Sequence, residues 1–448
     1  MLRDHRAQYR GHALAVVAPA DTAAVARVLA LCNELHIGVV PQGGNTSYCG
    51  GATPDASSSQ VLLSLARLDR IRAVDTANYT ITAEAGCILA DLHAAAAQAD
   101  RYLPLSLGSE GSCMLGGNLS TNAGGLNVIR YGMARELVLG LEVVLPDGRV
   151  LETLTGLRKD NTGYDIKSLF LGAEGTLGVI TAACLKLYPA PRAHATAFAA
   201  VRDPDAAVEL LARVRAGSGD SVSSFELIPR IGIDLTTRHI PGVVDPLSSP
   251  AEWYVLCELS SSRADAPLQP VLEHVLADAL RMGLVTDAAV ATSEREREAF
   301  WRLRESIPEA QRKEGASLKH DISVPVSQVP RFIERAGGWV ANHVPQGVLV
   351  AYGHLGDGNL HFNINQRPGY QIAQLQAVEP KLRRAVHDFV KELGGSFSAE
   401  HGIGQLKVFE LERYANPVEL ELMRRVKQAF DPNGIMNPGK VLVASPRK

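Results

Sequence analysis

The chain has 448 residues, and since hydrophobic cores stop growing at roughly 250–300 residues, two or three domains are expected. Hydrophobic residues make up 46% and charged residues 21%, with 45 basic against 48 acidic side chains and a net charge of −3. This balance is that of an ordinary globular protein, and it gives no support to nucleic-acid binding.

Cysteine usage and hydropathy bear on location. The six cysteines form neither a CxxC pair nor a zinc-finger spacing, so they are expected to be reduced, buried thiols of a cytoplasmic protein. The N-terminal stretch MLRDHRAQYRGHALAVVAP contains neither a secretory signal nor a membrane anchor, and no later segment offers 18 uncharged apolar residues. We expect a soluble protein without a transmembrane segment, and peripheral contact with a membrane stays open.

The first 190 residues are expected to form an α/β unit. A helix is predicted from its cap, Asp21, to Leu35, and the strand GVVP follows it. The strand TITAEAG leads into a helix near residues 89–100, and ELVLGLEVVLPDGRVLE is typical of a hairpin that turns at Asp147 and Gly148. The two prolines of LKLYPAPRA predict a linker near residue 190.

The second region alternates helices with strands. VELLARVR and PLQPVLEHVLADALRMG are predicted helices around the strands SFELIP and WYVLCELS, and one long polar helix is predicted at about residues 293–313. The strand ASLKHDISVPV, the helix SQVPRFIERAGGWVANHV, the hairpin GVLVAYGHLGDGNLHFNI and the helix KLRRAVHDFVKELGG follow. Helices laid over antiparallel strands indicate an α+β, ferredoxin-like cap.

Four segments of the first region are unusually rich in glycine, serine, threonine and asparagine: PQGGNTSYCGG, LGSEGSCMLGGNLSTNAGG, DNTGYD and GAEGTLGVIT. A single loop of this kind is more often a tight turn. Four of them favour a cradle for a pyrophosphate and a flavin, because glycine lets backbone N–H groups approach an anion closely. Neither GxGxxG after a first strand nor GxxxxGK[ST] occurs, so a different dinucleotide-binding fold is required.

The segments PQGGNTS, LGGNLSTNAGG, LRKDNTGYD and GAEGTLG resemble the FAD-binding domain of the vanillyl-alcohol oxidase (PCMH) type. From about residue 10 to NPGK at 437–440, the chain resembles the FAD-linked D-2-hydroxy acid dehydrogenases, and the D-2-hydroxyglutarate dehydrogenases most of all. The resemblance implies an α+β fold with a PCMH-type FAD domain at residues 1–190, a ferredoxin-like substrate and metal-binding cap at 191–420, and a C-terminal segment, 421–448, that returns to the FAD domain.

The same resemblance implies the flavin contacts. They are Gln42, Gly43, Gly44, Asn45, Thr46 and Ser47 at the pyrophosphate, and Gly108, Ser109, Gly117, Asn118, Asn122, Gly124, Glu174, Gly175, Thr176, Gly178 and Lys440 around the flavin. Family members with covalent flavin often carry a histidine in the first loop, where this chain has GGNTS. Non-covalent FAD is therefore expected.

In AYGHLGDGNLHFNI, His354 and His361 flank a Gly-Asp-Gly turn, and Glu400 and His401 follow in FSAEHGIG. Alone, two such histidines are more often polar strand or turn residues than ligands. Two imidazoles and a carboxylate would leave open positions on a divalent cation for the carboxylate and hydroxyl oxygens of a 2-hydroxy acid. The resemblance implies His354, His361 and Glu400 as ligands of a divalent metal, with zinc the first choice, His401 as the general base, and Asn363 beside the substrate.

Arg304 and Lys319 match positions that grip substrate carboxylates in the same family, whereas Arg304 taken alone in EREREAFWRLRE would belong to a solvated helix face. The hydroxyglutarate enzymes place a threonine four residues after that arginine, and this chain has Pro308 there. Proline offers neither a hydroxyl nor a backbone N–H to a second carboxylate. This departure keeps D-lactate or another D-2-hydroxy acid open as the substrate.

The expected reaction is oxidation of a small D-2-hydroxy acid, first of all D-2-hydroxyglutarate, to the 2-oxo acid, with hydride transfer from carbon 2 to flavin N5. An electron-transfer flavoprotein or a quinone would reoxidise the flavin, and a homodimer is plausible from the resemblance. Two alternatives stay open: a flavin subunit of a glycolate-oxidase-like complex, and a redox-neutral flavoenzyme resembling the alkyl-dihydroxyacetone-phosphate synthases.

Overall fold

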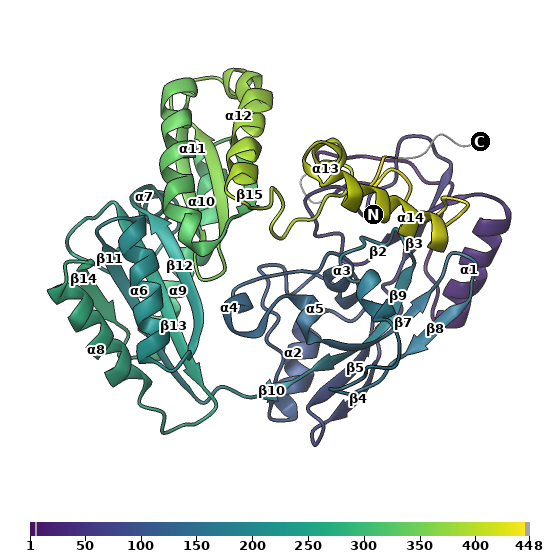
Figure 1. Cartoon of the computed structure of the whole chain (residues 1–448), viewed down its shortest axis with the longest axis horizontal. Helices are drawn as coiled ribbons and strands as arrows, with labels where there is room; N and C mark the ends of the chain where they lie inside the picture. The colour runs from purple at the N-terminus through teal and green to yellow at the C-terminus, as the bar shows by residue number, and fades with distance from the viewer. Residues whose placement is uncertain (5–6, 444–448) are drawn as a thin grey trace. The chain divides into compact units, whose positions relative to one another are not determined.

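The computed structural model describes residues 1–4 and 7–443, and the chain divides into two compact units. Unit 1 consists of Met1–Gly125, Tyr131–Ala190 and Glu400–Lys448, and unit 2 of Leu126–Arg130 and Pro191–Ala399. Figure 1 shows that each unit is built from its own sheets and helices. The chain thus enters unit 2 twice, briefly at Leu126 and again at Pro191, and returns to unit 1 at Glu400.

Unit 1 contains a parallel sheet in the order β1-β3-β2, an antiparallel sheet in the order β4-β5-β9-β7-β8, and the short pair β10-β6. Its elements are β1 (Ala15–Val17), α1 (Thr22–Glu34), β2 (Gly38–Gln42), β3 (Gln60–Ser64), β4 (Ile71–Asp75), β5 (Thr80–Glu84), α2 (Leu89–Gln98), β6 (Arg101–Tyr102), α3 (Leu115–Ser120), α5 (Ala134–Leu137), β7 (Val138–Val144), β8 (Val150–Thr153), the 3-10 helix η1 (Ile166–Leu169), β9 (Val179–Lys186), β10 (Tyr188–Pro189), α13 (Val408–Tyr414) and α14 (Pro417–Phe430).

The predicted elements of unit 1 are confirmed, with ends shifted by one or two residues. The side chain of Asp21 accepts a hydrogen bond from the Ala24 N–H at 2.7 Å and begins α1, whose apolar residues at helical spacing are buried. The β7–β8 hairpin turns at Gly148, which has a φ of +85°. The C-terminal segment adds a parallel bridge from Met436 to Val39 of β2, so the two ends of the chain meet in one core.

Unit 2 is built on one antiparallel sheet in the order β14-β11-β13-β12-β16-β17-β15. Its elements are β11 (Ala193–Val201), α6 (Pro204–Gly217), β12 (Val222–Pro229), α7 (Arg230–His239), β13 (Trp253–Ser261), α8 (Leu268–Arg281), β14 (Val285–Val290), α9 (Glu294–Glu305), α10 (Ile307–Glu314), β15 (Ser317–Ser323), the 3-10 helix η2 (Val326–Gln328), α11 (Val329–His343), β16 (Gly347–His354), β17 (Asn359–Gln366) and α12 (Ile372–Glu392). The short α4 (Val128–Tyr131) joins the two units along the chain.

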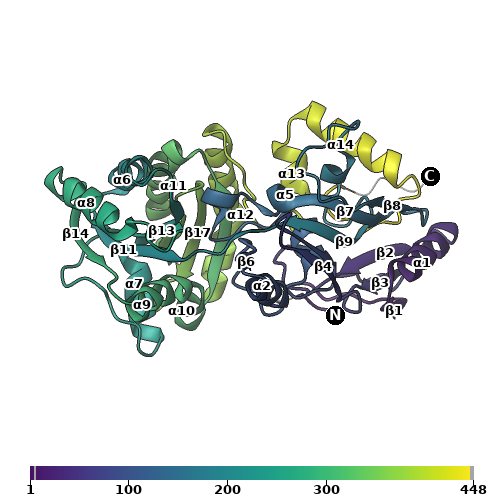
Figure 2. The same ribbon diagram turned by 90° about the horizontal axis from the view of Figure 1, so that it is seen from below.

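Helices cover both faces of the unit 2 sheet (Figure 2). Helices α6, α8, α11 and α12 pack on one face, and α7, α9 and α10 on the other. Because strand side chains alternate, Leu360, Phe362 and Ile364 of β17 enter the core under α11 and α12, while His361 and Asn363 point to the face that carries α9 and α10. That face, which we call the polar face, holds the candidate site residues of unit 2.

The prediction of one long helix at residues 293–313 is wrong, because two helices, α9 and α10, occupy this stretch and meet at Ser306. Pro308 is the second residue of α10. A proline inside a continuous helix would lack the N–H for its backbone bond and would clash with the carbonyl group four residues earlier. The first turn of a new helix accepts it, so the helix ends and begins again here.

The cap was predicted to extend to residue 420, whereas the division of the chain places residues 400–420 in unit 1. Backbone bonds give the reason. The buried carboxylate of Glu174 accepts hydrogen bonds from the N–H groups of Ile403 at 2.7 Å and Gly404 at 2.8 Å. The carbonyl group of Cys49 accepts one from the N–H of Gln405 at 2.9 Å. The loop after Glu400 is thereby fixed to the glycine-rich loops of unit 1.

Candidate active site

The β16–β17 hairpin brings two histidines together. His354 ends β16 and His361 is the third residue of β17, and their ring centroids lie 5.6 Å apart at an interplanar angle of 77°. The turn between them needs glycine at position 358, where φ is +82° and a Cβ would lie 2.1 Å from the Val324 carbonyl oxygen. The predicted Gly-Asp-Gly turn is therefore confirmed, and it sets the distance between the two imidazoles.

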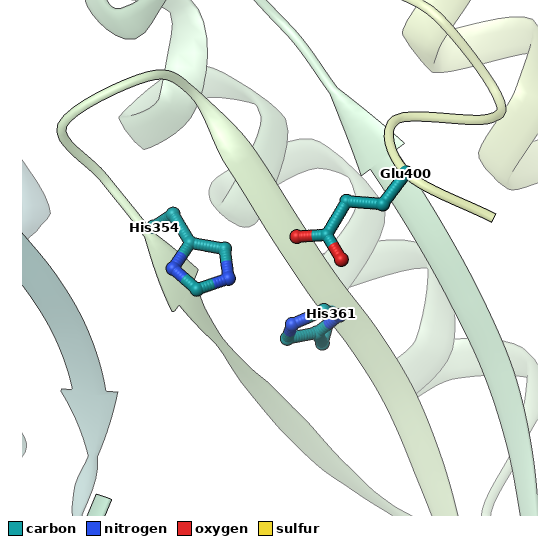
Figure 3. A group of neighbouring side chains, drawn as sticks. All are labelled: His354, His361 and Glu400. Carbon is teal, nitrogen blue, oxygen red and sulfur yellow. The ribbon is translucent and has the colours of Figure 1, made fainter. Parts of the chain in front are cut away.

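Glu400 completes a cluster with these two histidines (Figure 3). One ligand atom from each of His354, His361 and Glu400 lies within 4.8 Å of the others, and the Glu400 carboxylate points toward the two rings. Two imidazole nitrogens and a carboxylate oxygen are ligands that zinc and other divalent transition metals accept, with positions left for a substrate. The donor set predicted from the sequence is thus brought together in a form that fits a metal ion.

Each histidine of the cluster is backed by a buried carboxylate. His354 Nδ1 lies 2.7 Å from Oε1 of Glu226, and His361 Nδ1 lies 3.9 Å from Oδ1 of Asp321. Burial on its own would raise the pKa of Glu226, but the charges of Arg304 and His354 and their hydrogen bonds outweigh it and hold the pKa at about 2. Sequence reasoning missed both carboxylates, since each lies in a strand without a recognisable motif.

Arg304 occupies the same polar network. Its Nε donates to Oε2 of Glu226 at 2.7 Å, and its guanidinium carbon lies 4.9 Å from the ring centre of Tyr352. The side chain is only 5% exposed, so the alternative expectation of a solvated helix face is wrong for this residue. Glu226 therefore links this arginine to His354 of the cluster.

Lys319 and Asn363 lie opposite each other in neighbouring strands. They are register partners in the β15–β17 pair, so both side chains belong to the polar face. Lys319 is exposed, whereas Asn363 is buried and donates to Oε1 of Gln311 at 3.1 Å. Gln311 in turn donates to Oδ1 of Asn365 at 2.7 Å. A chain of amides thus orders the row of side chains that begins at His361.

His401 follows Glu400 but belongs to unit 1, where its ring packs edge-on against Tyr48 at a centroid distance of 4.7 Å. The loop beyond it is held by Glu174, whose carboxyl pKa is raised by burial against the opposing effect of its two backbone donors. Glu174 was predicted to line the flavin, and the structure shows its carboxylate hydrogen-bonded to Ile403 and Gly404. This role had no signal in the sequence.

The first predicted cofactor loop is built by close backbone approach. A Cβ on Gly44 would lie 2.2 Å from the Ser112 carbonyl oxygen, and Gln42 donates from Nε2 to the carbonyl groups of Met1 and Ala52. Asn45 has a φ of +54° and donates to the Arg3 carbonyl group at 2.8 Å. The loop that continues through Gly43, Thr46 and Ser47 is therefore fixed against the second glycine-rich loop.

The second and fourth loops contain both open and filled positions. A Cβ built on Gly108 or Gly117 would meet nothing within 4 Å, so the space over the backbone is open at both positions. By contrast, a Cβ on Gly178 would lie 2.9 Å from Val143 Cγ1, so this glycine serves packing against β7. The remaining predicted residues lie in the same loops of unit 1: Ser109, Asn118, Asn122, Gly124, Gly175 and Thr176.

Lys440 is buried in unit 1, and its Nζ makes a long hydrogen bond of 3.5 Å to the Pro438 carbonyl group. Burial lowers the pKa of this lysine to about 8. An ammonium group in such a place favours an anionic neighbour. Open glycine surfaces at 108 and 117, together with this buried cation, are features that FAD would use.

Comparison with known families covers most of the chain. Residues 13–154 match the family described as a FAD binding domain, and residues 190–441 match the family described as FAD linked oxidases, C-terminal domain. Among residues 1–4 and 7–443, no helix combines the length and the apolar character needed to cross a bilayer.

Curated relatives extend over nearly the full length. A rice protein (Oryza sativa subsp. indica) named "Probable D-2-hydroxyglutarate dehydrogenase, mitochondrial" is 41% identical over 444 residues, which is 99% of this chain and 77% of the rice protein. The D-2-hydroxyglutarate dehydrogenase of Danio rerio is 39% identical over 97% of this chain and 79% of its own. A D-2-hydroxyglutarate–pyruvate transhydrogenase of Saccharomyces cerevisiae is 34% identical over 98% of this chain and 88% of its own.

Two solved structures share the fold at low identity. A p-cresol methylhydroxylase with bound substrate matches with a TM-score of 0.73 and 16% identity, over 95% of this chain and 88% of that one. An alkyldihydroxyacetonephosphate synthase matches with a TM-score of 0.71 and 18% identity, over 94% and 76%. The α+β fold with a PCMH-type FAD-binding domain, expected from the sequence, is therefore confirmed.

Proposed function

The chain belongs to the family of FAD-linked D-2-hydroxy acid dehydrogenases, and from this premise we propose that it oxidises D-2-hydroxyglutarate to the 2-oxo acid with the help of a divalent metal. The observation that carries the proposal is the cluster of His354, His361 and Glu400, in a chain 41% identical to a relative named as a probable D-2-hydroxyglutarate dehydrogenase. Arg304 and Lys319 lie on the polar face of unit 2, which also carries the two histidines. Metal ligands and carboxylate-binding cations together match a substrate with a hydroxyl group between acid functions.

FAD, bound without a covalent link, would accept the hydride that leaves carbon 2 of the substrate. In this proposal the loop from Gln42 to Ser47 holds the pyrophosphate through backbone N–H groups, and Gly108 and Gly117 leave room for the flavin. The buried positive charge of Lys440 would contact the anionic cofactor in this proposal. The first loop offers no histidine for a covalent bond to the flavin.

The divalent ion, with zinc as first choice, would lower the pKa of the substrate hydroxyl group. His354 and His361 present neutral imidazole nitrogens and Glu400 a carboxylate oxygen to it. His401, next in sequence to Glu400, takes the hydroxyl proton as the general base. Its ring packs edge-on against the ring of Tyr48.

Arg304 and Lys319 bind substrate carboxylates in this proposal, and Asn363 hydrogen-bonds the substrate on the same strand face. The placement of Pro308 favours a second candidate. Its exposed ring, at the second position of α10, supplies no hydrogen-bond donor where the hydroxyglutarate enzymes have a threonine. D-lactate, which has a single carboxylate, is therefore the alternative substrate.

The reduced flavin must pass its electrons on. An electron-transfer flavoprotein or a quinone is the proposed acceptor, and a 2-oxo acid is a further one, suggested by the name of the yeast relative. We also propose a cytoplasmic homodimer. The six cysteines are all buried and free of disulfide bonds, which supports a reducing compartment but not one particular compartment.

The test is anaerobic reduction of the purified flavoprotein, monitored through the visible absorbance of the flavin. D-2-hydroxyglutarate, D-lactate and both L forms are mixed with protein that has been treated with chelator or left untreated. Bleaching by one D acid, abolished by chelator and restored by zinc or another divalent ion, is expected. Bleaching that is indifferent to chelator would overturn the metal role, and no bleaching by any acid would overturn the oxidation itself.

A further inference from the structure

Glu226 stands at the centre of the polar face. It lies in β12 opposite His354 in the β12–β16 register, and 1% of its side chain is exposed. Oε1 lies 2.7 Å from His354 Nδ1, while Oε2 accepts from Arg304 Nε at 2.7 Å and lies 2.6 Å from Nη2. One carboxylate therefore connects a proposed metal ligand to a proposed substrate-binding arginine.

The contact with His354 fixes the chemistry of the ring. A carboxylate at Nδ1 favours the tautomer that carries its proton there, which leaves the lone pair of Nε2 for a metal ion. The same contact stops the ring from rotating about its bond to Cβ. A partner of this kind raises the basicity of a ligating imidazole and orients it.

The contact with Arg304 fixes the plane of the guanidinium group. Glu226 binds the edge formed by Nε and Nη2, and the Tyr352 ring lies 4.9 Å from the guanidinium carbon. A fork held on one edge and on one face has a defined orientation for binding a carboxylate. Glu226 thus orients both groups that are proposed to contact the substrate: Arg304 directly, and the metal ion through its proposed ligand His354.

The same sheet face contains a matched carboxylate that lacks these connections. Glu258 of β13 is 8% exposed, accepts from Arg297 Nε at 2.7 Å and lies 3.5 Å from His194 Nδ1. Its partners include none of the predicted ligands or substrate residues. Glu258 therefore has the burial and ion pairing of Glu226 without the link to the cluster.

We propose that Glu226 is a positioning residue that holds His354 for the metal and Arg304 for the substrate, so that one carboxylate sets the distance between the two binding groups. The inference rests on the proposed function, because it takes the metal and substrate roles of these two residues from there. A buried ion pair that only stabilised the fold would have no such effect on ligands.

The experiment compares the wild type with the Glu226→Gln and Glu258→Gln variants. All three proteins are prepared with FAD bound and with metal removed by chelator. A glutamine oxygen can serve His354 or Arg304, but not both. We expect Glu226→Gln to weaken Zn²⁺ binding 10- to 100-fold in equilibrium dialysis and to raise the KM for the hydroxy acid. Glu258→Gln is expected to keep the zinc dissociation constant within about twofold. If Glu226→Gln does not fold, Glu226→Asp, which keeps the charge but is too short to span both partners, replaces it.

Wild-type zinc affinity in both variants would overturn the inference, as would equal weakening in both. The outcome is separable from the fate of the proposed function. If the wild type binds zinc but no hydroxy acid reduces its flavin, the substrate proposal fails while the zinc comparison still decides the role of Glu226. If the wild type binds no zinc, the metal site and this inference fall together.

Discussion

At the scale of single residues, Glu258 allows a prediction about acid stability. Burial would raise its pKa, but donors from Arg297, His194 and Trp301 hold the pKa at about 2. The sign follows from linkage. A carboxyl whose folded pKa lies below its ordinary value of about 4.5 stabilises the fold above that value, and this contribution is lost as the pH falls from about 4.5 to about 2.

For a side chain this little exposed, the contribution is on the order of 3 kcal/mol. Glu258→Gln should therefore lower the free energy of unfolding by a few kcal/mol at pH 7 and by nearly as much at pH 5, and the difference from wild type should shrink as the pH falls from about 4.5 to about 2. Urea unfolding followed by tryptophan fluorescence, at pH 7, 5 and 3, measures this. A difference that stays constant over that range would show that the carboxylate carries no charge-dependent stability.

Residues of the candidate site differed in how far the sequence could predict them. His354, His361 and Glu400 belong to short motifs with glycines, and the structure brings them together. Glu226 could not be found, because SFELIP reads as an ordinary strand and its partners lie 78 and 128 residues away along the chain. Long-range polar contacts of this kind depend on strand order, which no local pattern encodes.

At the scale of elements, the segment Leu126–Arg130 has a defined role in unit 2. Arg130 Nη1 donates to the carbonyl groups of Ser260 at 2.5 Å and Ser221 at 3.2 Å, and Ser224 Oγ donates to the Leu126 carbonyl group at 3.0 Å. Ile129 packs against the turn of the β16–β17 hairpin, where a Cβ on Gly356 would lie 2.6 Å from its Cδ1. The segment Leu126–Arg130 thus packs directly against the turn that connects His354 and His361.

The packing predicts a compensating pair of substitutions. Gly356→Ala should cost about 1–3 kcal/mol of unfolding free energy through its clash with Ile129, and Ile129→Ala in the same chain should recover part of that loss. Gly358→Ala should gain nothing from Ile129→Ala, because its Cβ meets the Val324 backbone at 2.1 Å. Urea unfolding of the single and double variants measures the coupling. Strict additivity of Gly356→Ala and Ile129→Ala would mean that the segment does not support the turn.

Elements with local signals were predictable, and those set by distant contacts were not. The hairpin, the capped helix α1 and the strands of both units follow from periodicity and turn residues. The break between α9 and α10 was missed, although Pro308 supplied a signal for it. Nothing in the sequence indicated that residues 126–130 would join unit 2, since that contact depends on partners about 100 residues later.

At the scale of the whole molecule, the residues proposed to bind FAD, metal and substrate are divided between the two units. Every residue proposed to hold FAD belongs to unit 1, while His354, His361 and the substrate residues belong to unit 2, and Glu400 is the first residue of the returning chain. The resemblance predicted a cofactor domain and a cap with a boundary at residue 190, and the match to the C-terminal domain of FAD linked oxidases begins at that residue. The sequence could not show that the cap is discontinuous.

This division predicts unfolding that depends on the probe and on the ligand. All three tryptophans, Trp253, Trp301 and Trp339, lie in unit 2, so their fluorescence reports that unit alone, whereas the flavin reports unit 1. A ligand that binds only one folded unit stabilises that unit by mass action. Added FAD should therefore raise the midpoint of the flavin-monitored transition by several degrees and shift the tryptophan-monitored transition much less. Zinc should have less effect on the flavin-monitored midpoint than FAD has. Two probes that coincide at every FAD concentration would show instead that the units unfold as one cooperative block, and the separate treatment of their stabilities would then be wrong.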